Sequence, residues 1–437
     1  MSKGYISPVA LRLCWILPCF ILALVSCSQP LKPAPKQGLH KVIVMPTAAQ
    51  GRVSAMLILP NTPAATGLAH YTEHLVWLNA IGNKQRRANS HSNAWTSSDS
   101  ISYWLAGDTD ELPTLLSTLA GVFSPLTLEP RFAKEELGIV LREYDLRIAQ
   151  NANAKAFEQS NEFLYAGTHY ADSLIGTPEQ IHSLDYELAK ALHAKVYQPR
   201  NAVLYVSGDV TEAQVLDILN TIELPANTSP AISVAPQAFA LAKPDQSVIR
   251  LKTQTPSPRL LWRKVVRLDA PVNYDILESH CIFLNDLLTT SLPGGLAGPL
   301  RFDAMIASHF EVNVFPHDEQ HLEIVFAAQP DENISLSELK QAFEQTLAAS
   351  VKNGIPTQTY ERIRKRFDRF WPKWNNFNDT SHWVSGYQQD RLKSLRTPLD
   401  VENLKQLGQN ITQQSTNKLL SQLGNDGRTT ITYKDME

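Results

Sequence analysis

The amino-acid sequence predicts an α+β protein made of two similar halves. Strand-like and helix-like hydrophobic patterns alternate through most of the 437 residues. A stretch at 225–247 carries four prolines among small residues, which is typical of a linker between domains. The order of strands and helices after this stretch is similar to the order before it, although no residue-level repeat is visible. The sequence therefore predicts a duplicated fold at the level of pattern.

The first half, 40–224, starts with two apolar runs, Lys41 to Met45 and Ser54 to Leu59, which predict a strand pair around Gly51. Its longest predicted helix, 131–149, has acidic residues early, where the positive end of the helix dipole stabilises them. The other elements expected here are a helix from about Gly67, a strand at 101–105, helices at 110–123 and 178–194, and a strand at 202–206.

The second half, 248–437, is expected to contain a strand at 248–252 and helices at 274–289, 336–352 and 357–369. His317 and His321 are four residues apart, but they lie between two apolar runs, so the pattern favours a hairpin turn over a helix. A turn does not by itself bring two imidazoles together. The apolar residues that follow Cys281 predict a buried, inert thiol.

The N-terminus has the features of a bacterial lipoprotein signal at residues 1–26. The apolar stretch that ends at Val25 is too short to span a bilayer comfortably. Leu24-Val25-Ser26-Cys27 resembles the lipobox, in which the bond before the cysteine is cut and Cys27 accepts a diacylglycerol. A plain secretory signal or a retained anchor are the alternatives. Residues 27–39, rich in proline, then form a tether.

This reading predicts a protein anchored by lipid to the bacterial outer membrane, facing the periplasm or the cell surface. Ser28 follows Cys27, where the usual inner-membrane retention residue is Asp. After processing, the acylated Cys27 and Cys281 are the only cysteines, so no intrachain disulfide is predicted. The formal net charge of −3 shows no basic excess, and a nucleic-acid partner is not expected.

The segment His70-Tyr71-Thr72-Glu73-His74 has the spacing of a metal site on a helix. Residues four apart on a helix are separated by only about 40° around its axis, so His70 and His74 can bind one metal ion. Glu73 lies three residues after His70 on the same face and can reach a water on that ion. Hydrolytic zinc sites use about three protein ligands and one open position, so a further ligand is required.

Glu136 and Glu143 are candidates for that ligand. They are seven residues apart on the predicted 131–149 helix, almost two full turns, and so share one face. Taken alone, the two acids would also fit a solvated acidic stripe.

Together these residues resemble the pitrilysin/insulinase family of zinc metallopeptidases, which includes the mitochondrial processing peptidases. Its motif is H-x-x-E-H, followed far downstream by a glutamate ligand with a second glutamate seven residues before it. The resemblance implies one Zn²⁺ per chain, held by His70, His74 and Glu143. It also implies that Glu73 is the general base and that Glu136 supports a ligand.

Further segments carry the resemblance. Those that match the family are Gly67 to His70, Ser92 to Ser97, Ile175 to Glu179 and Tyr197 to Asp209. The Ser92 to Ser97 segment implies that an extended substrate adds a strand beside Asn93 and Ala94. In the second half, a glycine-rich segment leads to Arg301, which the resemblance implies contacts substrate near the zinc. The tyrosine that the family places seven residues later is Ser308 here.

The resemblance implies two α+β halves, each an antiparallel-rich sheet with helices on one face, forming a clamshell around substrate. The implied activity is a zinc-dependent endopeptidase that hydrolyses peptides or unfolded polypeptide segments. Chains of this length commonly work in pairs, so a homodimer or a heterodimer with a homologous subunit is expected. The alternative is a binding or assembly subunit that cuts little by itself, which the missing tyrosine favours.

Overall fold

The computed structural model describes residues 38–47, 50–62, 64–82, 92–234, 239–253, 258–371 and 386–436. The predicted signal segment, Cys27 and nearly all of the predicted tether lie outside this part of the chain. Among the described residues, no helix is both long and apolar enough to cross a bilayer.

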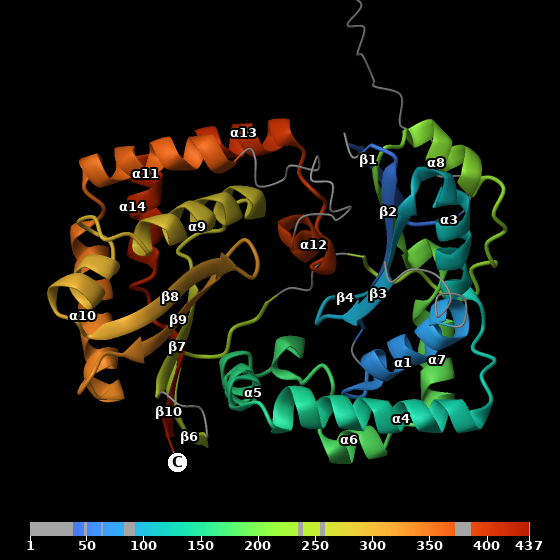
Figure 1. Cartoon of the computed structure of the whole chain (residues 1–437), viewed down its shortest axis with the longest axis horizontal. Coiled ribbons are helices and arrows are strands. Elements are labelled where there is room, and N and C mark those ends of the chain that lie inside the picture. Colours follow the sequence, from blue (N-terminus) through green and yellow to red (C-terminus); the bar gives the residue numbers. More distant parts are fainter. Residues whose placement is uncertain are drawn as a thin grey trace, which may run out of the picture. The chain divides into compact units, whose positions relative to one another are not determined.

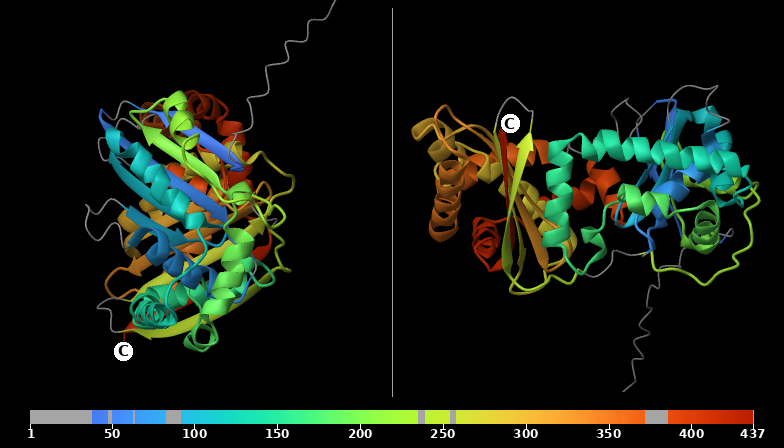
Figure 2. Two further views of the ribbon diagram at one scale, coloured as in Figure 1. Left: turned by 90° about the vertical axis from the view of Figure 1, so that its right-hand side faces the viewer. Right: turned by 90° about the horizontal axis from the view of Figure 1, so that it is seen from below.

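The first half is built on a five-stranded sheet with the order β1-β5-β2-β4-β3 (Figure 1). Its strands lie side by side in blue, cyan and green in the left view of Figure 2. Only β1 and β5 are parallel, and every other pairing is antiparallel. The strands are β1 (Lys41–Pro46), β2 (Arg52–Pro60), β3 (Ser92–Thr96), β4 (Ser100–Asp108) and β5 (Val203–Gly208).

The expected strand pair is wrong in one respect, because β1 and β2 form but are not neighbours. The apolar β5 lies between them and bonds to both. The physical reason is burial: Val53 to Pro60 of β2 are buried, as a strand in the middle of a sheet requires, whereas β1 is partly exposed at the sheet edge.

Helices of the first half cover one face of this sheet. Val53, Ala55, Leu57 and Leu59 alternate along β2 and pack with residues of these helices in one apolar core. These helices are α1 (Leu68–Val76), α3 (Leu112–Ala120), α4 (Pro130–Tyr144), α6 (Pro178–His182), α7 (Tyr186–Val196) and α8 (Glu212–Leu219), whereas α5 (Ala152–Leu164) packs against the second sheet. The predicted helix at 131–149 is α4, continued by a wider π turn at Asp145–Ala149.

The second half repeats the arrangement. Its sheet has the order β6-β10-β7-β9-β8, and again only the first pair is parallel. The expected two similar halves, each an antiparallel-rich sheet with helices, are confirmed. The strands are β6 (Asp245–Thr253), β7 (Arg259–Arg267), β8 (Ala307–Pro316), β9 (His321–Pro330) and β10 (Gly427–Met436). The helices are α9 (Tyr274–Leu288), α10 (Leu336–Asn353), α11 (Thr357–Phe370), α12 (Gly386–Lys393), α13 (Val401–Gln409) and α14 (Gln413–Gln422).

The opposite face of each sheet is covered by an element from the other half. Leu392 of α12 packs with Met56 and Ile58 against the first sheet. Leu164 and Tyr165, at the end of α5, pack with Val265 of the second sheet. The two halves are therefore joined by an exchange of helices, which the sequence pattern did not reveal.

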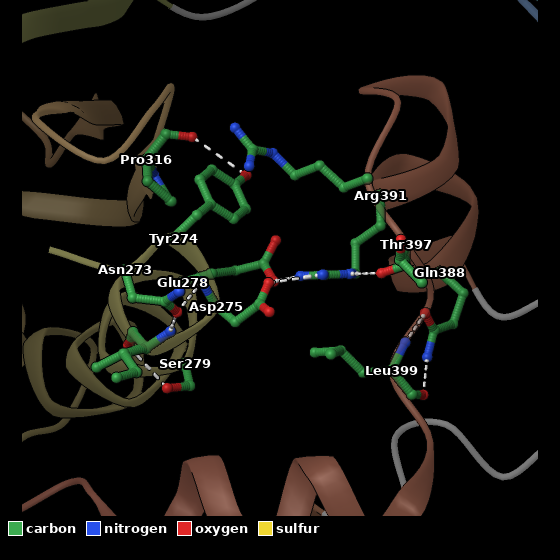
Figure 3. A network of polar contacts seen from close by, with 12 residues as sticks. Asn273, Tyr274, Asp275, Glu278, Ser279, Pro316, Gln388, Arg391, Thr397 and Leu399 are labelled. Atoms are coloured by element: carbon green, nitrogen blue, oxygen red, sulfur yellow. Dashed lines mark hydrogen bonds and ion pairs between the residues drawn. The ribbon is translucent and has the colours of Figure 1, made fainter. Parts of the chain in front are cut away.

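Arg391 fixes α12 to α9, as Figure 3 shows. Its Nη2 lies 2.6 Å from Asp275 Oδ1, it also pairs with Glu278, and its Nε donates to the Thr397 carbonyl at 3.0 Å. Arg391 is 3% exposed, so these contacts are largely screened from water. They hold α12 while Leu392, the next residue, reaches the first sheet.

Two smaller expectations are also confirmed. His317 and His321 flank the turn between β8 and β9, and the His317 amide donates to the His321 carbonyl at 2.9 Å. Cys281 is buried on α9, and burial raises the pKa of its thiol well above the usual value.

Candidate metal centre

The helix that carries the histidines starts at a glycine. Gly67 has φ +81°, and a Cβ there would lie 2.4 Å from the Ile175 carbonyl oxygen, so no other residue fits without a shift. From this cap α1 presents His70 and His74 on one face, with ring centroids 4.7 Å apart. The opposite residues Tyr71 and Leu75 are fully buried in the first core.

The two glutamates come from α4, which packs against α1 (Figure 1). The Tyr71 hydroxyl donates to the Ala133 carbonyl at 2.9 Å and ties the two helices together. Val140 of α4 is fully buried, so the side of α4 that bears Glu136 and Glu143 is held toward the histidines.

Three side chains converge at the centre. Glu143 Oε2 lies 3.5 Å from His70 Nε2 and 3.8 Å from His74 Nε2. One ligand atom from each of the three residues lies within 4.8 Å of the others. Glu136 Oε2 lies 3.1 Å from His74 Nδ1, on the far side of that ring. Glu73 Oε2 accepts a hydrogen bond from Thr96 Oγ1 on β3 at 3.2 Å.

Burial and neighbouring charges shift the pKa values of these groups in different directions. Burial and the neighbouring His74 lower the pKa of His70 to about 4. Burial also disfavours charge on His74, but Glu136 and Glu143 outweigh it and raise its pKa to about 9. Burial raises the pKa of Glu73 to about 7, and the nearby His74 lowers that of Glu143.

The donor set fits a zinc ion. Two imidazoles and one carboxylate are a ligand set that zinc uses in catalytic sites. His70 Nδ1 and Glu143 Oε2 are buried and have no hydrogen-bond partner within the described part of the chain. Buried polar atoms normally have partners, so the Glu143 oxygen that faces both rings is suited to a cation.

The centre opens into a cavity of about 760 Å³. His70, Glu73, His74, Glu136 and Glu143 all line it, and so do Asn93 and Ala94. Those last two residues belong to β3, the edge strand of the first sheet. The structure therefore places β3, which is the edge strand among the described residues, beside the candidate metal centre.

Arg301 is not brought to this cavity. It lies in the turn Gly298–Asp303, its side chain is exposed, and its guanidinium is 5.6 Å from the Phe302 ring centroid. Among the described residues that line the cavity, Arg301 does not occur.

Sequence reasoning missed several lining residues. Arg147 Nη2 lies 3.4 Å from Glu143 Oε1, and their spacing of four residues on a helix could have suggested the contact. Thr96 lies in the Ser92 to Ser97 segment that resembles the family, but the resemblance implies no role for it. Phe157 and Asn161 of α5 line the cavity too, and no local pattern marked them.

Two histidines on one helix and a carboxylate from a second helix converge at an open cavity. This arrangement makes the protein a candidate metallohydrolase. Comparison with known families agrees with this class. The model described as Insulinase (Peptidase family M16) matches residues 59–178, and that described as Peptidase M16 inactive domain matches 183–367. The chain belongs to peptidase family M16.

Individual relatives are distant. The human mitochondrial-processing peptidase subunit beta is 25% identical over 162 residues, which cover 35% of this chain and only 32% of that protein. The uncharacterized zinc protease YmxG of Bacillus subtilis is 20% identical over 318 residues, covering 70% of this chain and 74% of the relative. A protease from Helicobacter pylori has the same fold, with a TM-score of 0.72 at 18% identity, over 92% of this chain and 98% of that one.

Proposed function

We propose that this chain is a zinc-dependent endopeptidase that hydrolyses peptides or unfolded polypeptide segments. The observation that carries the proposal is the convergence of His70, His74 and Glu143 with Glu73 beside them at one cavity. Membership of family M16 and the similarity to a protein named as a zinc protease support it.

His70, His74 and Glu143 would hold the zinc ion. When bound, zinc polarises a carbonyl and lowers the pKa of its water to about 7. Glu73 would accept the proton of the attacking water and deliver it to the leaving amine. A general base works best when its pKa lies near the working pH, and burial raises that of Glu73 to about 7. Thr96 holds one carboxylate oxygen and so orients the base.

Substrate would bind as an extra strand on the edge of β3. The Asn93 side chain is exposed and Ala94 is half-buried beside the cavity. Backbone hydrogen bonds to a sheet edge recognise an extended chain with little dependence on its side chains. This mode suits unfolded segments better than folded proteins.

The proposal is tested with Glu73→Gln. The amide keeps the shape of the side chain but cannot accept a proton, so zinc content should stay at one per chain while hydrolysis falls by roughly 10²- to 10⁴-fold. Glu135→Gln, at an exposed position of α4, is the matched control and should remain active. Normal turnover by Glu73→Gln would exclude the role of Glu73.

A second candidate is a subunit that needs a homologous partner chain for full activity. One matched model is described as an inactive domain, one relative is named as a subunit, and Arg301 does not reach the cavity. Activity of the purified chain over a wide concentration range separates the two. Zinc-loaded protein that is inactive at every concentration would favour the second candidate.

We also propose that the mature chain is anchored by lipid at Cys27 to the outer membrane of a bacterium. The support is the lipobox-like Leu24-Val25-Ser26-Cys27 and the Ser28 that follows it. An anchor at that position would keep the catalytic half close to the membrane surface.

A further inference from the structure

A buried ion pair lies behind one wall of the metal cavity. Arg263 of β7 is 3% exposed, and its Nε donates to Glu323 Oε1 of β9 at 2.6 Å. Glu323 has no exposed surface. Both residues belong to the second half, yet the remaining donors of Arg263 point toward the first half.

Those donors reach α5. Arg263 Nη1 donates to Asn161 Oδ1 at 2.7 Å and to the Phe157 carbonyl at 3.5 Å. Its guanidinium lies over the Phe157 ring, 4.6 Å from the centroid, and Nη2 donates to the Tyr165 hydroxyl at 3.0 Å. One guanidinium therefore holds three successive turns of α5.

Two of these α5 residues also face the metal cavity. Phe157 and Asn161 line it together with His70 and Glu143. Phe157 is 41% exposed, although its ring lies against a buried arginine. The side-chain oxygen of Asn161 accepts a hydrogen bond from Arg263. The side-chain nitrogen Nδ2 of Asn161 has no protein acceptor among the described residues. The side chains thus present an apolar ring and a free amide donor.

Stability alone does not explain this pair. Taking an arginine and a glutamate out of water is costly, and an apolar pair of similar size is often as stable. What an apolar pair cannot do is donate hydrogen bonds to Asn161 and to the Phe157 carbonyl. The pair is suited to fix the position of the two wall residues.

We infer that Arg263 is a positioning residue that builds a substrate subsite from Phe157 and Asn161, and that this subsite takes a large apolar side chain of the peptide. The Phe157 ring provides the apolar surface, and Asn161 Nδ2 donates to the peptide backbone. The inference rests on the proposed peptidase function and deepens it by naming a class of substrate. The second half then shapes the catalytic cavity without entering it.

The test is a double variant, Arg263→Met with Glu323→Leu, compared with Arg263→Met alone. The single variant leaves the buried Glu323 without its arginine, with His317 and Tyr165 as its remaining partners, and should be clearly less stable. The double variant replaces both charges, and Tyr165 and His317 keep their mutual contact of 3.2 Å. Its melting temperature and zinc content should return close to those of the wild type.

If Arg263 is a positioning residue, the double variant should regain the stability of the wild type but not its binding of substrate. For a peptide with Leu or Phe near the cleaved bond, KM of the double variant should rise roughly 3- to 30-fold, because a wall displaced by less than 1 Å already costs binding and rate. The same peptide with Ala at that site should be little affected. Phe157→Ala, which leaves the ion pair intact, should show the same loss of preference.

Affinity for the same peptides, labelled with a fluorophore, is measured in parallel on zinc-loaded proteins that also carry Glu73→Gln. This measurement of affinity does not depend on turnover. A wild-type protein that binds the peptides but does not cut them would therefore contradict the proposed function and not the subsite. A stable double variant with unchanged KM, affinity and preference would overturn the positioning role. An unchanged preference in Phe157→Ala would overturn the apolar subsite.

Discussion

His74 Nδ1 lies 3.1 Å from Glu136 Oε2, and this contact decides which nitrogen of the ring faces the metal centre. When the Nδ1 proton points at Glu136, the Nε2 lone pair is available to bind a metal ion on the side of Glu143. A carboxylate behind a metal-binding histidine also raises the basicity of the ring. Glu136 would therefore act on a bound metal ion through His74.

We predict that Glu136→Gln weakens zinc binding without abolishing it. The amide still accepts from His74 but lacks the negative charge, and the loss of such outer partners typically costs about 10- to 100-fold in metal affinity. Competition with a chelator of known affinity measures the change. Glu135→Gln, one residue earlier and exposed, should bind zinc as the wild type does.

We expect a larger effect from Glu143→Gln. Its Oε2 is the atom that faces both histidines, so its replacement removes a charged ligand from the donor set. The purified variant should retain little zinc after dialysis, while its far-ultraviolet circular dichroism stays unchanged. Zinc content equal to that of the wild type would show that Glu143 is not a ligand.

Much of the candidate site could be predicted from the sequence because its spacings are local. His70, Glu73 and His74 lie within one helical turn, and Glu136 and Glu143 within two turns, so their faces follow from helix geometry alone. The meeting of α1 with α4 came from the family resemblance. The duplicated order of elements was likewise visible as a pattern.

What could not be predicted depends on long-range pairing. The sequence predicts strands at Lys41 to Met45 and Ser54 to Leu59, but not that β5, some 150 residues later, bonds to both of them. The placement of α5 against the second sheet, and with it the contact of Arg263 with Asn161, has no signature in either segment. Such contacts are set by tertiary packing.

The proposed lipid anchor gives a prediction that is independent of catalysis. If Cys27 is acylated, cells grown with labelled palmitate should label the wild-type chain and not the Cys27→Ala variant. The acylated wild type should also be shorter by the 26-residue signal. Equal labelling of both chains would contradict acylation at Cys27, and Cys281→Ala is the control that should leave the label unchanged.

Arg391→Met should destabilise the contact between α12 and α9 (Figure 3). The change leaves Glu278, whose side chain is 13% exposed, without its arginine partner, and breaking such a pair from one side costs about 3 kcal/mol. Unfolding by urea measures the loss. Lys393→Met, on the same helix but more exposed, should cost less than about 1 kcal/mol. Similar losses in both variants would contradict the anchoring role of Arg391.

The pair of Arg263 and Glu323 predicts a loss of stability in acid. Burial disfavours a charged Glu323, but Arg263 and His317 outweigh it and lower its pKa to about 2. Because the folded pKa is below the usual 4.5, the stabilisation is fully present above pH 4.5 and is lost as the pH falls toward 2.

A shift of this size corresponds to about 3 kcal/mol in the free energy of unfolding. Glu323→Gln removes the titrating group and leaves Arg263 buried without its charge partner, so the variant should be less stable than the wild type at pH 7. Its deficit should then shrink as the pH is lowered from 5 to 3. Over that interval Glu323 takes up a proton in the unfolded wild type but not in the folded one, where its pKa is about 2, and the variant has no such group. Urea unfolding at each pH gives the difference directly. A deficit that stays constant across this range would show that Glu323 is not held in its charged form by Arg263.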